Sequence, residues 1–89
     1  MENAKVVLVH DRDLRHLYVN PAISRLTGRP QSDFLGRTVR EMGFPPELSE
    51  QLDGLLRRTR DTACEQSGDL VVPDAAGGRH FQWRSVPLL

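Results

Sequence analysis

The chain has 89 residues, and its 12 basic and 12 acidic side chains give a formal net charge of zero. This length predicts one small domain, residues 1–89, which buries roughly 60–65% of its unfolded surface. The balanced charge gives no electrostatic basis for nucleic acid or an anionic membrane as the main partner. No apolar run approaches the ~20 residues that cross a bilayer, and a single cysteine excludes an intrachain disulfide, so we expect a cytoplasmic domain.

The start of the chain predicts two strands joined by a tight turn. Residues 6–9 are β-branched and aliphatic, as in a buried strand, and Asp11 and Asp13 supply turn chemistry. In the next run, Leu17 and Val19 alternate with a histidine and a tyrosine, which is the period of a strand with two different faces.

A short helix is predicted to follow these strands. Asn20 can accept hydrogen bonds from the first helical amides and Pro21 suits the first helical position, so Asn20 is expected to be a structural cap. Ile23 and Leu26 fall on one helical face, and Gly28 suits the left-handed residue that ends a helix.

The middle of the chain predicts two helical turns and then one long helix. The turns cover residues 31–35 and 38–42, and a glycine and two prolines then break the pattern before a helix that runs to residue 62. Gly54 inside this helix costs about 1 kcal/mol relative to alanine, so we expect a close packing contact there. The buried face of the helix is one apolar stripe: Leu48, Leu52, Leu55, Leu56 and Thr59.

Beyond Cys64 the pattern changes to β. Residues 65–72 and 79–88 are predicted strands, and residues 73–78 are a loop of ordinary length between them. The order strand-strand-helices-strand-strand predicts an α+β fold. Along the last strand two faces alternate, with Phe81, Trp83 and Ser85 on one and His80, Gln82, Arg84 and Val86 on the other.

This order of motifs resembles the PAS sensory-domain family. The resemblance rests on DRDLRHLYVNPA, TGRPQSDFLGRT, a Leu-rich helix and GGRHFQWRSVPL, and it covers about residues 5–89. It implies an α+β domain whose antiparallel sheet carries helices on one face. PAS sheets have five strands, with the fifth in the middle beside the first, and we expect that final strand to be lacking after Leu89.

A missing central strand leaves two inner strand edges without partners, at about 1–3 kcal/mol for each unpaired buried group. Two outcomes are expected. Another chain supplies or exchanges a strand, or the strands at residues 6–9 and 81–86 close directly against each other in a four-stranded sheet. We favour the first outcome, a homodimer, because an exposed edge is a template for self-pairing.

The cofactor classes that the resemblance implies can be compared with the residues present. Flavin-binding members carry a reactive cysteine in a helix motif, but residues 36–40 hold none, and Cys64 is expected to be a small, partly buried thiol. Haem-binding members use a histidine on the long helix, which has none here. His10, His16 and His80 are expected to be surface or hairpin-pairing side chains, because no carboxylate or cysteine completes a metal site with them.

We therefore expect no metal and no cofactor, while a small-molecule ligand of unknown identity stays open. No phosphate-cradling loop, nucleophile elbow or metalloprotease motif is present, so no catalytic residue is assigned and the domain is not expected to be an enzyme.

The space between helices and sheet is the candidate ligand pocket, because PAS domains either hold a small molecule there or pack it solid. Two functions stay open: a small-molecule sensor of a bacterial signal-transduction protein, and a ligand-free module that dimerises. In both, an attached output domain is expected (histidine kinase, phosphatase, cyclic-di-nucleotide enzyme or transcription regulator), and a solid core would favour the second function. The residues expected to converge in this space are Ile23, Leu26, Phe34, Leu35, Val39, Leu52, Leu56 and Trp83.

Overall fold

The computed structural model describes residues 5–72 and 78–89. Every predicted strand and helix is present with slightly different ends, and residues 73–77 of the predicted loop lie outside the described residues. In chain order the elements are β1 (Lys5–His10), β2 (His16–Val19), α1 (Ala22–Thr27), the 3-10 turns η1 (Gln31–Asp33) and η2 (Arg40–Met42), α2 (Pro46–Thr62), β3 (Gln66–Val72) and β4 (Arg79–Pro87).

The described strands form one four-stranded sheet in the order β2-β1-β4-β3. β1 is antiparallel to β2 and β3 to β4, but β1 and β4 are parallel, so the expectation of a wholly antiparallel sheet is wrong for the central pair. The physical reason is directional. In a five-stranded antiparallel sheet the middle strand opposes both neighbours, so the first and fourth strands already point the same way and pair in parallel when they meet directly.

The direct pairing of β1 with β4 is the second of the two outcomes expected from the sequence. Val6 pairs with Trp83 and Leu8 with Ser85 along the shared register. The inner strand edges are therefore satisfied within the chain. A dimer now needs support other than an unpaired central edge.

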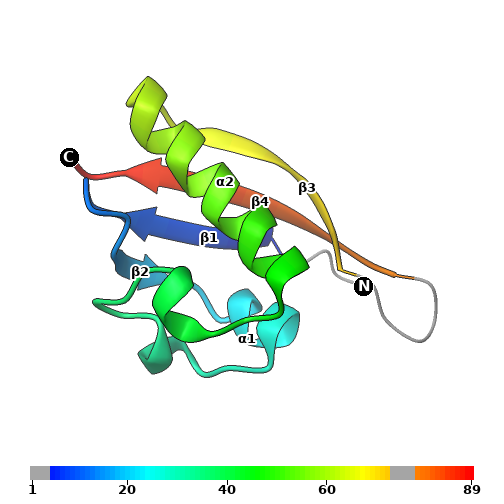
Figure 1. Ribbon diagram of the computed structural model, residues 1–89. Helices are drawn as coiled ribbons and strands as arrows, with labels where there is room; N and C mark the ends of the chain where they lie inside the picture. The colour runs from blue at the N-terminus through cyan, green and yellow to red at the C-terminus, as the bar shows by residue number, and fades with distance from the viewer. Residues whose placement is uncertain (1–4, 73–77) are drawn as a thin grey trace.

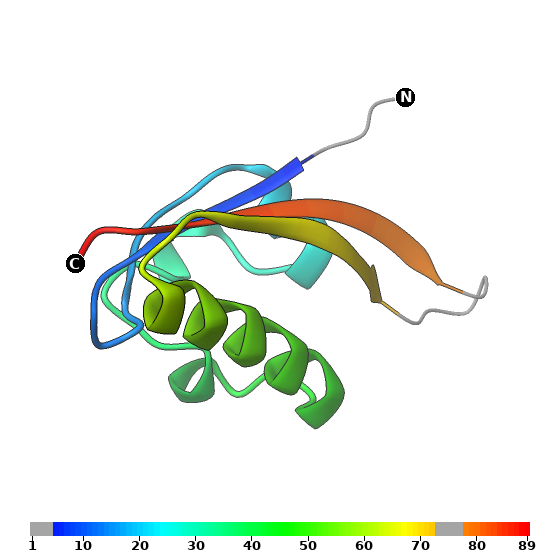
Figure 2. The same ribbon diagram turned by 90° about the horizontal axis from the view of Figure 1, so that it is seen from above.

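The core lies between α2 and one face of this sheet. Helix α2 crosses that face, and α1, η1 and η2 lie on the β2 side of the domain (Figures 1 and 2). On β4 the predicted alternation is confirmed, because Phe81, Trp83 and Ser85 are buried. The Trp83 ring lies over Gly68 of β3, where an added Cβ would come within 3.0 Å of it. The predicted stripe of α2 is also confirmed: Leu52, Leu55, Leu56 and Thr59 are buried, and Leu48 packs against the same cluster.

Strand β2 departs from the predicted alternation. His16 and Val19 are buried, whereas Leu17 and Tyr18 between them are both exposed. The pairing of β1 with β2 shifts register at residues 9–10, so an irregularity of the β-bulge type interrupts the period of two.

Asn20 does not cap the helix, contrary to the sequence prediction. The N-cap position is Pro21, with no side-chain cap bond. The Asn20 Oδ1 instead accepts from the Val7 N–H at 2.9 Å, and its Nδ2 donates to the Lys5 carbonyl at 2.7 Å. Asn20 thus extends the β1–β2 pairing with its side chain, a role that needs both a donor and an acceptor.

Replacing Asn20 distinguishes this role from capping. Asn20→Ala should lower the free energy of unfolding by about 1–3 kcal/mol, because the Val7 amide loses its acceptor. Asn20→Asp should also destabilise, since a carboxylate cannot donate to the Lys5 carbonyl, whereas a cap position accepts Asn and Asp equally well. Urea unfolding at pH 7 measures both, and an Asp variant as stable as the wild type would restore the capping role.

Candidate functional site

Seven of the eight residues predicted to line a ligand pocket are brought together. They lie in one core cluster with their side chains buried: Ile23, Leu26, Phe34, Val39, Leu52, Leu56 and Trp83. Leu35 is the exception and that prediction is wrong, because it is 51% exposed while its backbone bridges to His16. Two open hollows lie in the described part of the chain. Trp83 is among the residues that line one of them, of about 220 Å³, and none of the seven lines the other.

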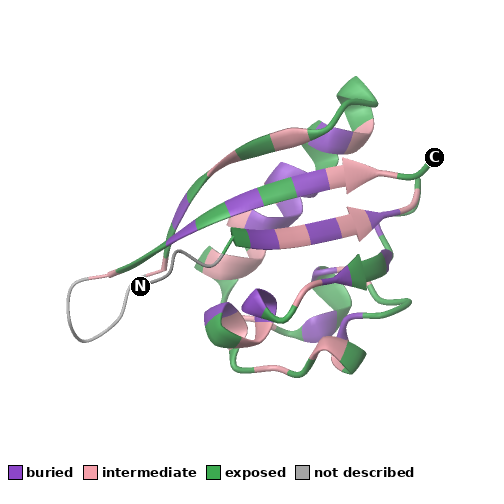
Figure 3. Cartoon of the chain, turned by 180° about the vertical axis from the view of Figure 1, so that it is seen from behind, coloured by how far each residue is buried: buried purple, intermediate pink, exposed green. Residues whose placement is uncertain are grey.

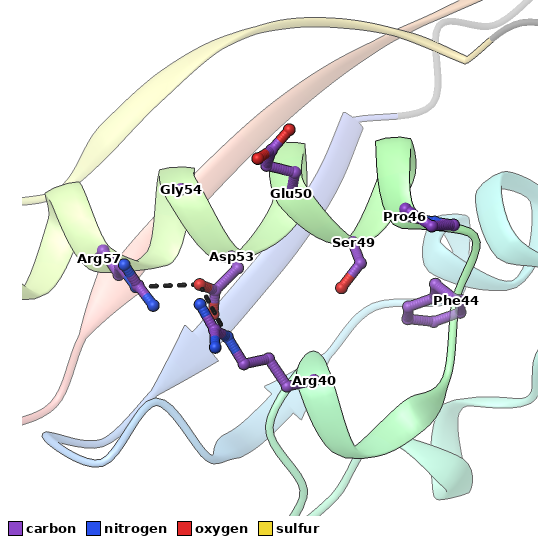
Figure 4. Close-up of a pocket in the computed structure, with 8 residues that line it drawn as sticks. All are labelled: Arg40, Phe44, Pro46, Ser49, Glu50, Asp53, Gly54 and Arg57. Carbon is purple, nitrogen blue, oxygen red and sulfur yellow. Dashed lines mark ion pairs between the residues drawn. The ribbon is translucent and has the colours of Figure 1, made fainter.

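The larger hollow, of about 450 Å³, is a groove on the side of α2 away from the sheet (Figure 4). We call it the α2 groove. One side of it is the helix, and the other is the segment from η2 to the start of α2. Its lining residues are Arg40, Phe44, Pro46, Ser49, Glu50, Asp53, Gly54 and Arg57.

One end of the α2 groove is a charge cluster around Asp53. This residue is only 8% exposed, and two guanidinium groups converge on its carboxylate (Figure 4). The Arg57 Nε lies 2.9 Å from Asp53 Oδ2, and the Arg40 Nε lies 3.5 Å from the same oxygen. The i,i+4 spacing of Asp53 and Arg57 could have been read from the sequence. The approach of Arg40 from η2 could not, because it depends on how the connecting segment folds.

Gly54, beside this cluster, has no close packing contact, which contradicts the expectation from the sequence. A Cβ built at Gly54 would meet no atom within 4 Å. The glycine therefore leaves the helix backbone bare at the groove. Packing inside the domain does not explain a residue that disfavours the helix.

Substitution of Gly54 should accordingly stabilise the domain. Gly54→Ala is expected to raise the free energy of unfolding by about 0.5–1 kcal/mol, through helix propensity alone. Gly68→Ala is the contrasting control, because its Cβ would press on the Trp83 ring and should destabilise. Urea midpoints measure both, and a loss of stability in Gly54→Ala would show that the position is packed after all.

A second polar feature lies in the β1–β2 hairpin, where His10 and His16 face each other. The two are register partners and are buried at 0% and 1% exposure, so hairpin pairing is confirmed and a surface position is wrong for them, while His80 is exposed. The His10 Nδ1 donates to the Asp11 carbonyl at 2.9 Å, and the His16 Nδ1 donates to the Arg37 carbonyl at 2.8 Å.

These bonds fix how each ring can carry a proton. A carbonyl only accepts, so Nδ1 holds the hydrogen in each neutral ring and Nε2 is left as an acceptor. The His10 Nε2 is buried without a hydrogen-bond partner among the described residues. Burial holds the pKa of His16 below its ordinary value of 6.5; the Arg37 carbonyl opposes this and the charge of His10 adds to it.

The His16 pKa predicts acid sensitivity. Between its lowered folded pKa and 6.5 the unfolded chain binds more protons, so stability should be full above pH 6.5 and fall as the pH drops below it. Urea midpoints at pH 7.5 and 5.5 measure this. His16→Asn, which keeps a donor but does not titrate, should flatten the dependence, and His80→Asn should not. An unchanged slope in His16→Asn would assign the effect to other groups.

The face of the sheet opposite α2 is uncovered. Seen from behind, the strands lie in front of the helix and no helix crosses them (Figure 3). Tyr18 of β2 pairs with Val9 of β1, and Val9 pairs with Val86 of β4, so these side chains form one row on that face. Val7 lies two residues along β1 on the same face. We call these four residues the outer patch; Tyr18 is 49% exposed and the valines are half-buried.

Other candidate chemistries find no support in the described residues. Cys64 is exposed, so the prediction of a partly buried thiol is wrong. Among residues 5–72 and 78–89, no three His, Cys, Asp or Glu side chains are grouped to hold a metal ion. No helix within those same ranges is long and apolar enough to cross a membrane.

A small sheet with a long helix on one face and a bare opposite face is an α+β architecture. The family model described as PAS fold matches residues 4–89, almost the whole chain. The chain therefore belongs to the PAS family, which confirms the resemblance read from its motifs. Comparisons with curated proteins and with solved structures found no match.

Proposed function

We propose that this PAS domain is a regulatory interaction module that associates with a second copy of itself through the outer patch and so controls an attached output domain. Family membership supports a sensory or regulatory role. The seven buried candidate pocket residues pack into one core cluster, which favours an interaction module over a sensor with a preformed internal cavity.

The observation that carries the proposal is the position of apolar side chains on an uncovered face. Tyr18, Val9 and Val86 are adjacent across three strands, and partly exposed apolar groups in a contiguous row mark interaction surfaces. Leu88, which follows β4, is 59% exposed and adds apolar surface near the end of the chain.

The rest of the same face supports a second copy as the proposed partner. Apart from Val71, its β3–β4 half carries polar side chains, with Asp69 paired to Gln82 and Ser67 paired to Arg84. A two-fold axis through the β1–β2 half would place outer patch on outer patch and leave the polar half in solvent. Self-association needs no second surface on the chain.

A small-molecule sensor is the second candidate. It requires the core side chains to separate around a ligand. The polar atoms available to bind that ligand are the His10 Nε2 and the Ser85 Oγ, which are both buried without hydrogen-bond partners among the described residues.

We further propose that the parent is a bacterial cytoplasmic signalling protein and that the domain binds no metal, flavin or haem and is not itself catalytic. The Arg-rich composition and the single unpaired cysteine support this setting.

The proposal is tested by sedimentation of the 89-residue protein. Tyr18→Glu should raise the dimer dissociation constant at least ~10-fold, because the symmetric interface would bury the charge twice. Val71→Glu is the matched control: Val71 is 43% exposed, also lies on a strand, and is outside the outer patch, so it should leave dimerisation unchanged. A wild-type protein that stays monomeric at high micromolar concentration, or equal effects of both variants, would reject the interface.

A further inference from the structure

We infer that the α2 groove binds a small monoanionic carboxylate that carries an apolar body. The groove lies on the side of α2 away from the sheet, so this site is separate from the outer patch (Figure 4). The inference does not depend on dimerisation, and it assigns a ligand class to a surface that the core-based sensor hypothesis does not use. The volume of the α2 groove, about 450 Å³, is within the range of small-molecule sites.

The charge of the cluster selects the anion. Arg40 and Arg57 bring two positive charges to the single carboxylate of Asp53, which leaves one positive charge uncompensated. Glu50 also lines the groove, but its carboxylate points away from the cluster (Figure 4). One excess positive charge matches a carboxylate of charge −1 better than a phosphate, which carries about −1.5 to −2 at pH 7.

Donors for this anion are present on both arginines. Each guanidinium approaches Asp53 through Nε, so the terminal Nη groups keep hydrogen-bond donors for a ligand. The side chains of Arg40 and Arg57 are 69% and 49% exposed, whereas that of Asp53 is 11% exposed. Asp53 therefore anchors the two cations from beneath, while their outer surfaces face the groove and form charge-assisted bonds with a planar carboxylate.

The other end of the groove is apolar and fits the body of the ligand. Phe44 and Pro46 lie at the start of α2, away from the charge cluster (Figure 4). The Phe44 ring is held by two neighbours. The centroids of the Phe44 and Phe34 rings are 5.9 Å apart, and the Arg29 Cζ lies 5.5 Å from the Phe44 ring centroid. A fixed aromatic ring at one end and fixed cations at the other orient an amphipathic anion along the helix.

The glycine at position 54 independently supports a ligand site in the α2 groove. A Cβ at this position would enter open space, so no neighbour in the domain requires glycine. Glycine is nevertheless about 1 kcal/mol less favourable than alanine inside a helix. Its effect is to bare the backbone where the groove passes, which admits a flat ligand close to α2.

Titration of the 15N-labelled protein with benzoate, followed by NMR, tests the site. Benzoate should shift amides of residues 40–44 and 49–57 in a saturable way, and the neutral isostere benzamide should bind at least ~10-fold more weakly. Arg40→Gln and Arg57→Gln should each weaken benzoate binding about 10-fold. Arg58→Gln, which removes the same charge one residue outside the groove, should not.

Gly54→Leu separates a filled groove from a damaged fold. Leucine favours the helix and would occupy the hollow, so this variant should melt at or above the wild-type temperature and yet lose the benzoate shifts. Equal binding of benzamide and benzoate, retained binding in Gly54→Leu, equal effects of Arg57→Gln and Arg58→Gln, or inorganic phosphate bound as tightly as benzoate would each overturn the inference. A monomeric protein that binds benzoate as described would keep this inference and reject the proposed dimer.

Discussion

Pairing between β1 and β4 joins two hairpins that would each be marginal alone, since an isolated two-stranded hairpin is at best barely stable in water. The register places Val6 and Leu8 beside Trp83 and Ser85, so the buried faces of the two hairpins become one surface. That surface is what α2 covers. The same pairing leaves the opposite face continuous and bare, so the core and the outer patch both follow from one strand contact.

Helix α2 then has different environments on its two sides. Its leucines face the sheet, and their burial supplies much of what keeps a domain of 89 residues folded. On its other side, Asp53 and Gly54 interrupt what would otherwise be an ordinary solvated surface. A buried carboxylate needs compensating cations, and the cations that reach Asp53 come from α2 itself and from η2. The helix is thus tied both to the sheet beneath it and to the segment that precedes it.

Much of this fold could be predicted from the sequence because its signals are local or periodic. The stripe through Leu52 and Leu56 marks the buried side of α2 whatever the rest of the chain does. The prediction that Asn20 caps the helix was wrong because the same side-chain amide can serve as a helix cap or as a partner for a strand backbone. Only the position of Val7 decides between these roles. The parallel central pair and the bulge in β2 likewise depend on how distant segments meet, and a local stretch of sequence carries no information about that.

The candidate site was harder to predict than the fold for the same reason. The i,i+4 pair of Asp53 and Arg57 is local, but Arg40 joins it only through the course of the chain between η2 and α2.

Since α2 contacts β3 and β4, a ligand held between Arg40 and Arg57 acts on the element that rests on the sheet, while a partner at the outer patch acts on the strands beneath it. Any coupling between the two sites must be reciprocal: the factor by which a bound carboxylate changes the dimer dissociation constant equals the factor by which dimerisation changes carboxylate affinity. A ligand that binds monomer and dimer equally shifts nothing, however tightly it binds. Regulation through the groove therefore requires that the groove bind its ligand with different affinity in the monomer and in the dimer.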